Sequence, residues 1–184
     1  MATNTGNIAI GACQVLVGAY VTAGAAQGTM VDCGHTKGPT TLNVTGNDYE
    51  IATEQSFGTI RKIPISATVK LKVLIDEATL ANMRIAFRQA TGQLTGTAPN
   101  ATLLVGNITE QYHQIQLVTK GTGTSPTTAA TRTITIWRGI IESVAEIPFG
   151  KAGEQTLETT IDCLYDDTVA TGDKFLKVVD SGGA

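Results

Sequence analysis

The chain has 184 residues, a formal net charge of −3 at pH 7, 42% hydrophobic residues and only 16% charged residues. The length is typical of one domain. The charged fraction lies below the roughly 25% of most soluble domains, so uncharged polar residues or neighbouring subunits must cover part of the surface. The slightly acidic balance argues against a protein that grips nucleic acid.

The first apolar segment, residues 8–26, carries no charge. It lacks a positive flank, and Gly, Gln and Thr interrupt it, so it is a poor signal peptide and a poor membrane span. We expect a strand, a turn near 23–28 and a second strand. A secretory signal is the weaker alternative.

Further along, residues 46–60 are polar with weak periodicity and predict a flexible loop. The longest alternating stretch follows at 63–75, where period two predicts a strand with one buried face. Its apolar face collects Ile63, Ile65, Ala67, Val69, Leu71, Val73 and Ile75. Asp76 then stands where a helix cap is expected, and Gly92 where a helix would end. Apolar residues at helical spacing between them predict one amphipathic helix at about 77–91.

After the helix the chain again reads as strands and turns. Strand-like segments are 101–105, 110–119, 132–143, 154–165 and 175–179. A Gly/Thr/Ser/Pro segment at 120–131 predicts a surface loop, and residues 180–184 predict a loose C-terminal tail. Because no linker or repeat divides the chain, we expect one domain, 1–184. Its fold class is mainly β: a β-sandwich or barrel with one flanking helix.

The sequence predicts no enzyme. Three cysteines lie in or just beyond predicted strands: Cys13, Cys33 and Cys163. Free cysteines are most often buried small hydrophobes, although a Cys13–Cys33 disulfide across neighbouring strands is feasible. Cys33 and His35 form only a local pair, whereas a zinc site needs a tetrahedral set of ligands. With no nucleophile elbow, phosphate loop or metal motif, we expect no catalytic residue, metal or cofactor.

A second alternating segment places Glu154, Glu158 and Asp162 on one strand face. Residues four apart on a strand are separated by roughly 13 Å, which is too far for the carboxylate pair of a glycosidase. Two interpretations stay open: a solvated strand face, or a charged wall facing an internal channel. Lys70 and Lys72, expected on another polar strand face, could equally line such a channel.

Two stretches resemble the tail tube (major tail) proteins of long-tailed bacteriophages. The first, within 34–90, consists of GHTKGPTTLNV, the polar DYEIATEQSFGTI, the alternating ISATVKLKVLIDE and the helical TLANMRIAFRQA. The second is RTITIWRGIIESVAEIPFGKAGEQTLETTIDCLYDD. Together they cover well over half of the chain, and the likeness rests on the order of the elements and on their residue patterns.

This resemblance implies hexameric rings that stack into a hollow tube, in a virion tail made in the bacterial host cytoplasm and not anchored in a membrane. The tube would carry the tape-measure protein and then DNA, without binding DNA specifically. A tail terminator, distal tail or baseplate proteins and, in some tails, a sheath would be its other partners. Rings would join laterally by extending one sheet with another.

The resemblance also suggests roles for two groups of residues. Residues 47–60 would form a loop that reaches a neighbouring ring. The contact residues would be Asn47, Asp48, Tyr49, Glu50, Glu54, Gln55 and Phe57. The acidic face of Glu154, Glu158 and Asp162 would line the lumen and keep DNA from sticking.

Two alternative functions stay open. A tube protein of a phage-derived contractile injection or secretion device would share this architecture. A secreted β-sandwich adhesin or carbohydrate-binding module would need a signal in 8–26 and exposed aromatic residues. Trp137 lies in a predicted strand, where we expect core packing rather than sugar binding.

Overall fold

The computed structural model describes residues 13–22, 28–52, 59–97, 99–106, 108–120, 131–144, 155–169 and 172–181. Within these ranges the protein is mainly β with one short α-helix, which confirms the predicted fold class. The strands are β1 (Gln14–Ala19), β2 (Met30–His35), β3 (Thr41–Ala52), β4 (Thr59–Ile75), β5 (Leu94–Thr95), β6 (Thr102–Leu103), β7 (Tyr112–Lys120), β8 (Thr131–Val144), β9 (Leu157–Cys163) and β10 (Leu176–Ser181). The helix is α1 (Leu80–Ala86), and a 3-10 turn, η2 (Thr91–Gln93), follows it.

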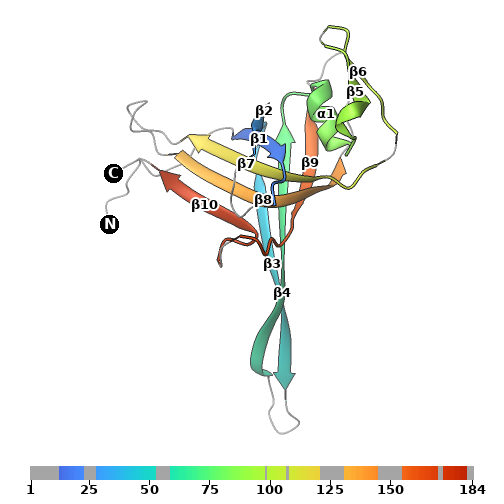
Figure 1. Ribbon diagram of the computed structural model, residues 1–184. Helices are drawn as coiled ribbons and strands as arrows, with labels where there is room; N and C mark the ends of the chain where they lie inside the picture. Colours follow the sequence, from blue (N-terminus) through green and yellow to red (C-terminus); the bar gives the residue numbers. More distant parts are fainter. Residues whose placement is uncertain are drawn as a thin grey trace.

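The main sheet is antiparallel and curves back on itself. Its strand order is β2-β1-β7-β8-β9-β4-β3, and β10 pairs with the first part of β8 while β9 pairs with the last part. The two sides meet where Thr36, just after β2, bridges Ile75 at the end of β4. The Lys37 amide donates to the Leu74 carbonyl at 2.8 Å beside this bridge. We call the curled sheet from β2 to β4 the barrel (Figure 1).

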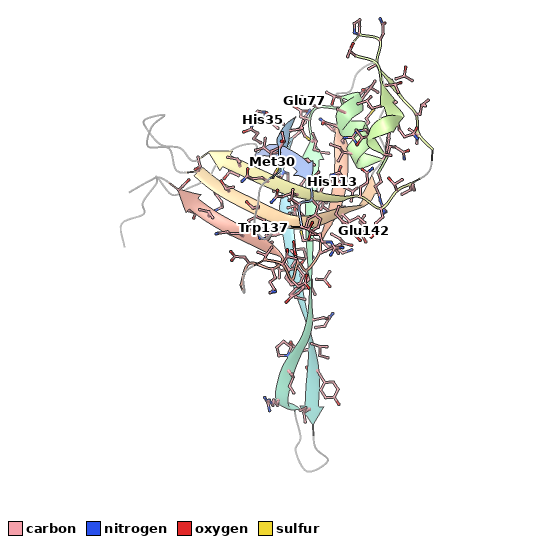
Figure 2. All side chains as sticks on the ribbon, viewed as in Figure 1. Met30, His35, Glu77, His113, Trp137 and Glu142 are labelled. Atoms are coloured by element: carbon pink, nitrogen blue, oxygen red, sulfur yellow. The ribbon has the colours of Figure 1, made fainter. Side chains whose placement is uncertain are left out.

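The core fills the barrel with branched aliphatic side chains. Its buried members are Val15, Val17, Cys33, Val69, Leu71, Val73, Ile75, Ile115, Leu117, Ile136, Ile141, Leu157, Ile161 and Cys163. Along β9 every second residue from Leu157 to Cys163 is buried, so the alternation predicted for this segment is confirmed. Trp137 on β8 (Figure 2) is buried without being a member of this core cluster, and its burial removes it as a sugar-stacking surface.

Helix α1 covers one end of the barrel and is shorter than predicted. Thr79, not Asp76, caps it: its Oγ1 accepts a hydrogen bond from the Asn82 amide at 3.2 Å. The helix ends at Ala86, and Arg88 rather than Gly92 adopts the left-handed conformation, with φ 55°. The Thr109 amide and hydroxyl both bond to the Arg88 carbonyl, at 3.1 and 3.0 Å. This long-range contact replaces the next helical turn.

The predicted loop at 46–60 is wrong for most of its length. β3 continues to Ala52 and β4 begins at Thr59, and the two strands stay paired from Thr41 opposite Lys72 to Ala52 opposite Thr59. Their far halves leave the barrel as a two-stranded ribbon, residues 46–52 and 59–67 (Figure 1). Both faces of the ribbon are exposed, so its sequence is polar and lacks the alternation of a half-buried strand.

Two other predicted boundaries also differ. β7 ends at Lys120 and β8 begins at Thr131, so the rest of the predicted loop at 120–131 lies outside the described residues. The predicted tail at 180–184 is wrong for its first two residues, because Asp180 and Ser181 belong to β10 and pair with Arg132 and Thr131. Residues 182–184 lie outside the described ranges.

Candidate assembly surfaces

The ribbon carries apolar side chains that no part of the described chain covers. Tyr49 is 59% exposed and Ile65 is 67% exposed, and Ile63, the register partner of Tyr49, is also exposed. The expectation of one buried face along 63–75 therefore holds only from Val69 onward. The sequence shows that Ile63 and Ile65 are apolar, but not that β4 has left the barrel at that point.

Polar contacts hold the two ribbon strands in register. Lys62 forms an ion pair with Glu50 directly opposite. The Asn47 side-chain amide donates to the Ser66 hydroxyl at 3.1 Å. Exposed pairs of this kind contribute little stability, because water and salt screen them. The ribbon is therefore a formed but weakly supported projection.

The ribbon brings together part of the predicted contact set. Asn47, Asp48, Tyr49 and Glu50 lie consecutively on β3. The other three predicted contact residues, Glu54, Gln55 and Phe57, lie outside the described residues.

β3 also presents an open sheet edge. It is the last strand in the sheet order, so among the described residues only β4 pairs with it. Its twelve residues contain neither Lys nor Pro, which commonly block edge-to-edge pairing. Val44 on this strand is exposed, as are Val178 and Val179 on β10. The free edges of β3 and β10 could each accept a further strand.

A second group of exposed apolar residues lies on the segment between β6 and β7. Its members are Leu104, Val105 and Ile108, and Ile108 is 70% exposed. The Leu104 amide bonds to the Gln93 carbonyl at 2.9 Å, and the Gly106 amide bonds to Gln89 Oε1 at 3.0 Å. These bonds hold the group beside α1, at the other end of the molecule from the ribbon (Figure 1). We call it the 104–108 patch.

The predicted lumen face is a mixed, ion-paired surface. Lys70 lies opposite Asp162, and Lys72 Nζ lies 2.5 Å from Glu158 Oε1. The expectation that the lysines occupy another face is therefore wrong, because register puts both beside the acidic residues. With Glu142 included, two lysines meet three carboxylates on this face, a net charge of −1. Glu154 lies outside the described residues.

All three cysteines are free thiols. The Cys13 carbonyl accepts from the Thr36 amide at 2.8 Å, and the Cys13 amide donates to Thr36 Oγ1 at 2.9 Å. Cys13 therefore faces Thr36 across the strands, and the Cys13–Cys33 disulfide considered from the sequence does not form in this structure. Burial raises the pKa of Cys33 to about 11 and that of Cys163 to about 12, so both stay protonated at neutral pH.

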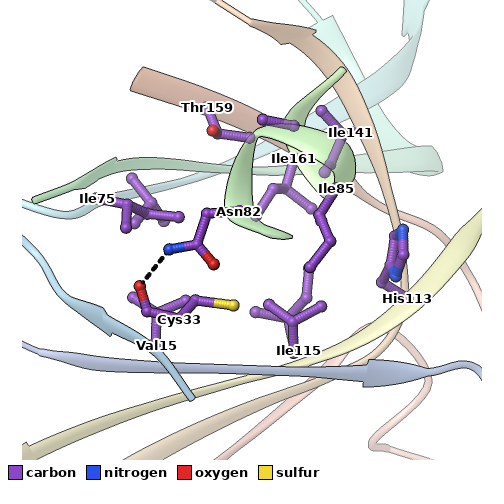
Figure 3. A pocket seen from close by; sticks show the side chains of 13 residues that line it. Val15, Cys33, Ile75, Asn82, Ile85, His113, Ile115, Ile141, Thr159 and Ile161 are labelled. Atoms are coloured by element: carbon purple, nitrogen blue, oxygen red, sulfur yellow. Dashed lines mark hydrogen bonds between the residues drawn. The ribbon is translucent and has the colours of Figure 1, made fainter. Parts of the chain in front are cut away.

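Two hollows lined by described residues lie beneath α1 and at the base of the ribbon. The cavity beneath α1, of about 20 Å³, is lined mainly by aliphatic side chains, together with Cys33, Asn82, His113 and Thr159 (Figure 3). An open groove of about 520 Å³ lies at the ribbon base, beside Ile65, Tyr165 and Phe175. Among the described residues no three His, Cys, Asp or Glu side chains are placed to hold a metal ion. No described helix is long and apolar enough to cross a membrane.

No protein-family model matches the sequence, and a search of curated proteins finds no significant match. The function must therefore be inferred from the surfaces of this chain.

Proposed function

We propose that this chain is a structural subunit that assembles with copies of itself into stacked rings, forming a hollow tube of the phage-tail type. The ribbon carries the proposal. It projects from the barrel and exposes Tyr49, Ile63 and Ile65, and an apolar surface held out in this way is characteristic of a contact site. Its partner would be a neighbouring ring.

The energetics of the ribbon favour a bound state. An isolated two-stranded hairpin is marginally stable in water, because it has no third strand or core to pack against. Full burial of a large apolar side chain is worth about 1.5–3 kcal/mol. Covering Tyr49, Ile63 and Ile65 would therefore stabilise both the ribbon and the assembly.

The sheet edges supply the second kind of contact. β3 offers an edge free of Lys and Pro over twelve residues. Strand addition from a neighbouring subunit would pair its free amides and carbonyls. The low charged fraction, 16%, agrees with a surface that is partly covered in the working state.

The position of the two apolar surfaces favours head-to-tail growth. The ribbon and the 104–108 patch differ in residues and lie at opposite ends of the molecule (Figure 1). Two unlike patches on one chain produce a heterologous contact, which repeats from copy to copy without closing. Such contacts between rings would build a tube, with the patch as one surface that a ribbon could meet.

The mixed charged face suits a wall that DNA passes. Ion pairing leaves this face only slightly acidic, so it would not attract phosphate groups. In this proposal the tube conducts the tape-measure protein and then DNA, and it meets terminator and baseplate proteins at its ends. A phage-derived injection device would use the same subunit contacts.

Negative-stain electron microscopy of the purified full chain, over a series of protein and salt concentrations, tests the proposal. We expect six-fold rings or hollow tubes that persist at high salt, because apolar burial is not screened by ions. Ile65→Asp should abolish them. Val21→Asp, at an exposed apolar position outside the ribbon and the 104–108 patch, should leave them intact. Assembly by Ile65→Asp equal to that of the parent chain would contradict the role of the ribbon.

A further inference from the structure

His113 stands at the boundary between the barrel interior and the solvent side of α1. Its side chain lines the cavity beneath the helix and also an open groove of about 410 Å³ between α1, β1 and β2. The residue is only 9% exposed, and its Nε2 atom has no hydrogen-bond partner within the described structure. A neutral imidazole tolerates one unpaired nitrogen at moderate cost, but a buried imidazolium without a partner is far more costly.

Packing on the barrel and the side chain of Asn82 hold α1 above His113. The helix has seven residues, too few to be stable alone, so its packing on the barrel holds it in place. The Asn82 side-chain amide donates to the Cys33 carbonyl at 2.8 Å and to the Glu77 carbonyl at 2.7 Å. Ile85 lies against the cavity, and Cys33 lies directly below the helix (Figure 3). Displacement of α1 would expose the Cys33 thiol.

The groups around His113 give an added proton little compensation. Arg84 on α1 is positively charged and disfavours a second cation. Glu77 before α1 and Asp32 on β2 line the same groove. Asp32 already accepts from the Gln14 side chain at 2.7 Å and from the Gly34 amide at 2.9 Å.

The residues paired with His113 on the two neighbouring strands, Ala19 and Gly139, carry no charge. On β1 the Gly18 carbonyl is hydrogen-bonded to it, and on β8 the residue opposite it is Gly139. The adjacent Tyr112 ring packs against Arg138, whose guanidinium carbon lies 4.0 Å from the ring centre. Among the described residues no ion pair involves His113, although the carboxylates of Glu77 and Asp32 line the same groove.

We propose that α1 is a lid on one end of the barrel, and that it stays closed only while His113 is uncharged. Acid would then detach α1 from the end of the barrel that it covers, while the other end of the barrel stays folded. The inference concerns a single subunit and does not depend on the proposed assembly.

The direction of the pH effect follows from the surroundings of His113. Burial first, and then Arg84, hold the pKa of His113 below its usual value near 6.5, while the Gly18 carbonyl acts in the opposite sense. As the pH falls, His113 therefore takes up a proton in the open form at a higher pH than in the closed form. Closure is strongest above about pH 6.5, and the opening equilibrium rises by up to about tenfold per pH unit below it, until the closed form also titrates.

Thiol labelling of the full chain tests this lid. A dithiodipyridine reagent, which reacts in mild acid as well as at neutral pH, would be applied between pH 7.5 and 5. Peptide mass spectrometry would separate Cys33 from Cys163, a buried thiol on β9 away from the cavity under α1. Labelling of Cys33 relative to Cys163 should rise several-fold as the pH falls, whereas global unfolding would expose both thiols together. A ratio that does not change with pH overturns the proposal.

Substitutions assign the effect to His113. His113→Gln keeps polar hydrogen-bonding groups but cannot take up a proton, so the rise in the Cys33 to Cys163 ratio should vanish. His35→Gln, at an exposed histidine on β2, should retain the full rise. If His113→Gln does not fold, Arg84→Gln provides the test. Removal of the neighbouring cation should reduce the rise in the Cys33 to Cys163 labelling ratio at pH 5. An unchanged rise in either folded variant overturns the role of His113.

Discussion

Lys70 on β4 lies opposite Asp162 on β9, and its Nζ sits 3.5 Å from Asp162 Oδ1 and 2.7 Å from Glu142 Oε2 on β8. One lysine thus links three neighbouring strands on the outer face of the barrel. The hydrogen bond with Glu142 raises the pKa of Lys70, so the lysine stays charged throughout the physiological range. The face balances its charges and does not present a uniform acidic wall.

Glu158→Lys should make this face bind DNA. The change removes the partner of Lys72 and converts a net charge of −1 over the five groups into +1. Folding should hardly change, because an exposed ion pair is worth about 0–1 kcal/mol. Co-sedimentation with duplex DNA at low salt should increase and should fall again as salt is added. Glu110→Lys, an exposed change on another surface, is the control, and equal DNA binding by both variants would contradict a special role for this face.

Val44→Lys should weaken assembly without affecting the fold. Val44 is exposed on the free edge strand β3, and a lysine at an edge opposes the approach of a second strand. The free energy of unfolding should stay within about 0.5 kcal/mol of the parent value, as for most surface changes. Analytical ultracentrifugation should show smaller species than for Val21→Lys at equal concentration. Identical distributions for the two variants would exclude pairing along this edge.

The sequence alone predicts those parts of the fold whose environment is uniform along a segment. The alternation of β9 marks a strand with one buried face, and that face is buried. The alternation of β4 continues unchanged from Val69 back to Ile63, yet only the part from Val69 onward meets the core. Burial depends on where the barrel stops, which is a property of the whole sheet.

Long-range contacts explain the other differences. Asp76 is a good cap by type, but its amide bonds to the His35 carbonyl at 2.9 Å, where the barrel closes, and the helix begins after Thr79. The shared face of Lys70 and Asp162 depends on the pairing of two strands far apart in the chain. Neither contact leaves a local pattern that could have revealed it.

Asp166→Asn should lower stability near neutral pH and have a smaller effect in acid. The Asp166 carboxylate accepts from the Thr168 hydroxyl at 2.6 Å and from the Thr168 amide at 3.0 Å. Burial tends to raise the pKa of Asp166, but the Thr168 bonds, together with the Tyr20 hydroxyl and the charge of Arg138, hold the pKa below its usual value. The stabilisation is therefore present above about pH 4 and is lost as the pH falls through the lowered pKa.

Urea unfolding of the Asp166→Asn variant at pH 7 and pH 3 measures this effect. The loss at pH 7 should be about 1.5–3 kcal/mol, as for hydrogen bonds to a charged group, and it should be smaller at pH 3. Asp173→Asn, at a partly exposed acidic residue in the same segment, should show no comparable loss. An equal loss at both pH values would show that the asparagine side chain destabilises the fold through its packing and not through the loss of the carboxylate charge.

Val15→Ile should stabilise the barrel by filling the cavity beneath α1. Val15 is buried and lines this cavity of about 20 Å³, so the added methylene has unfilled space beside it. Burying one methylene is worth about 0.8 kcal/mol, which corresponds to a rise of roughly 2–3 °C in Tm for a chain of this size. Differential scanning calorimetry would measure this shift. Leu117→Ile, a volume-conserving change at a core position that does not line the cavity, should give no gain. A lower Tm for Val15→Ile would mean that the cavity walls cannot accept the longer side chain without strain.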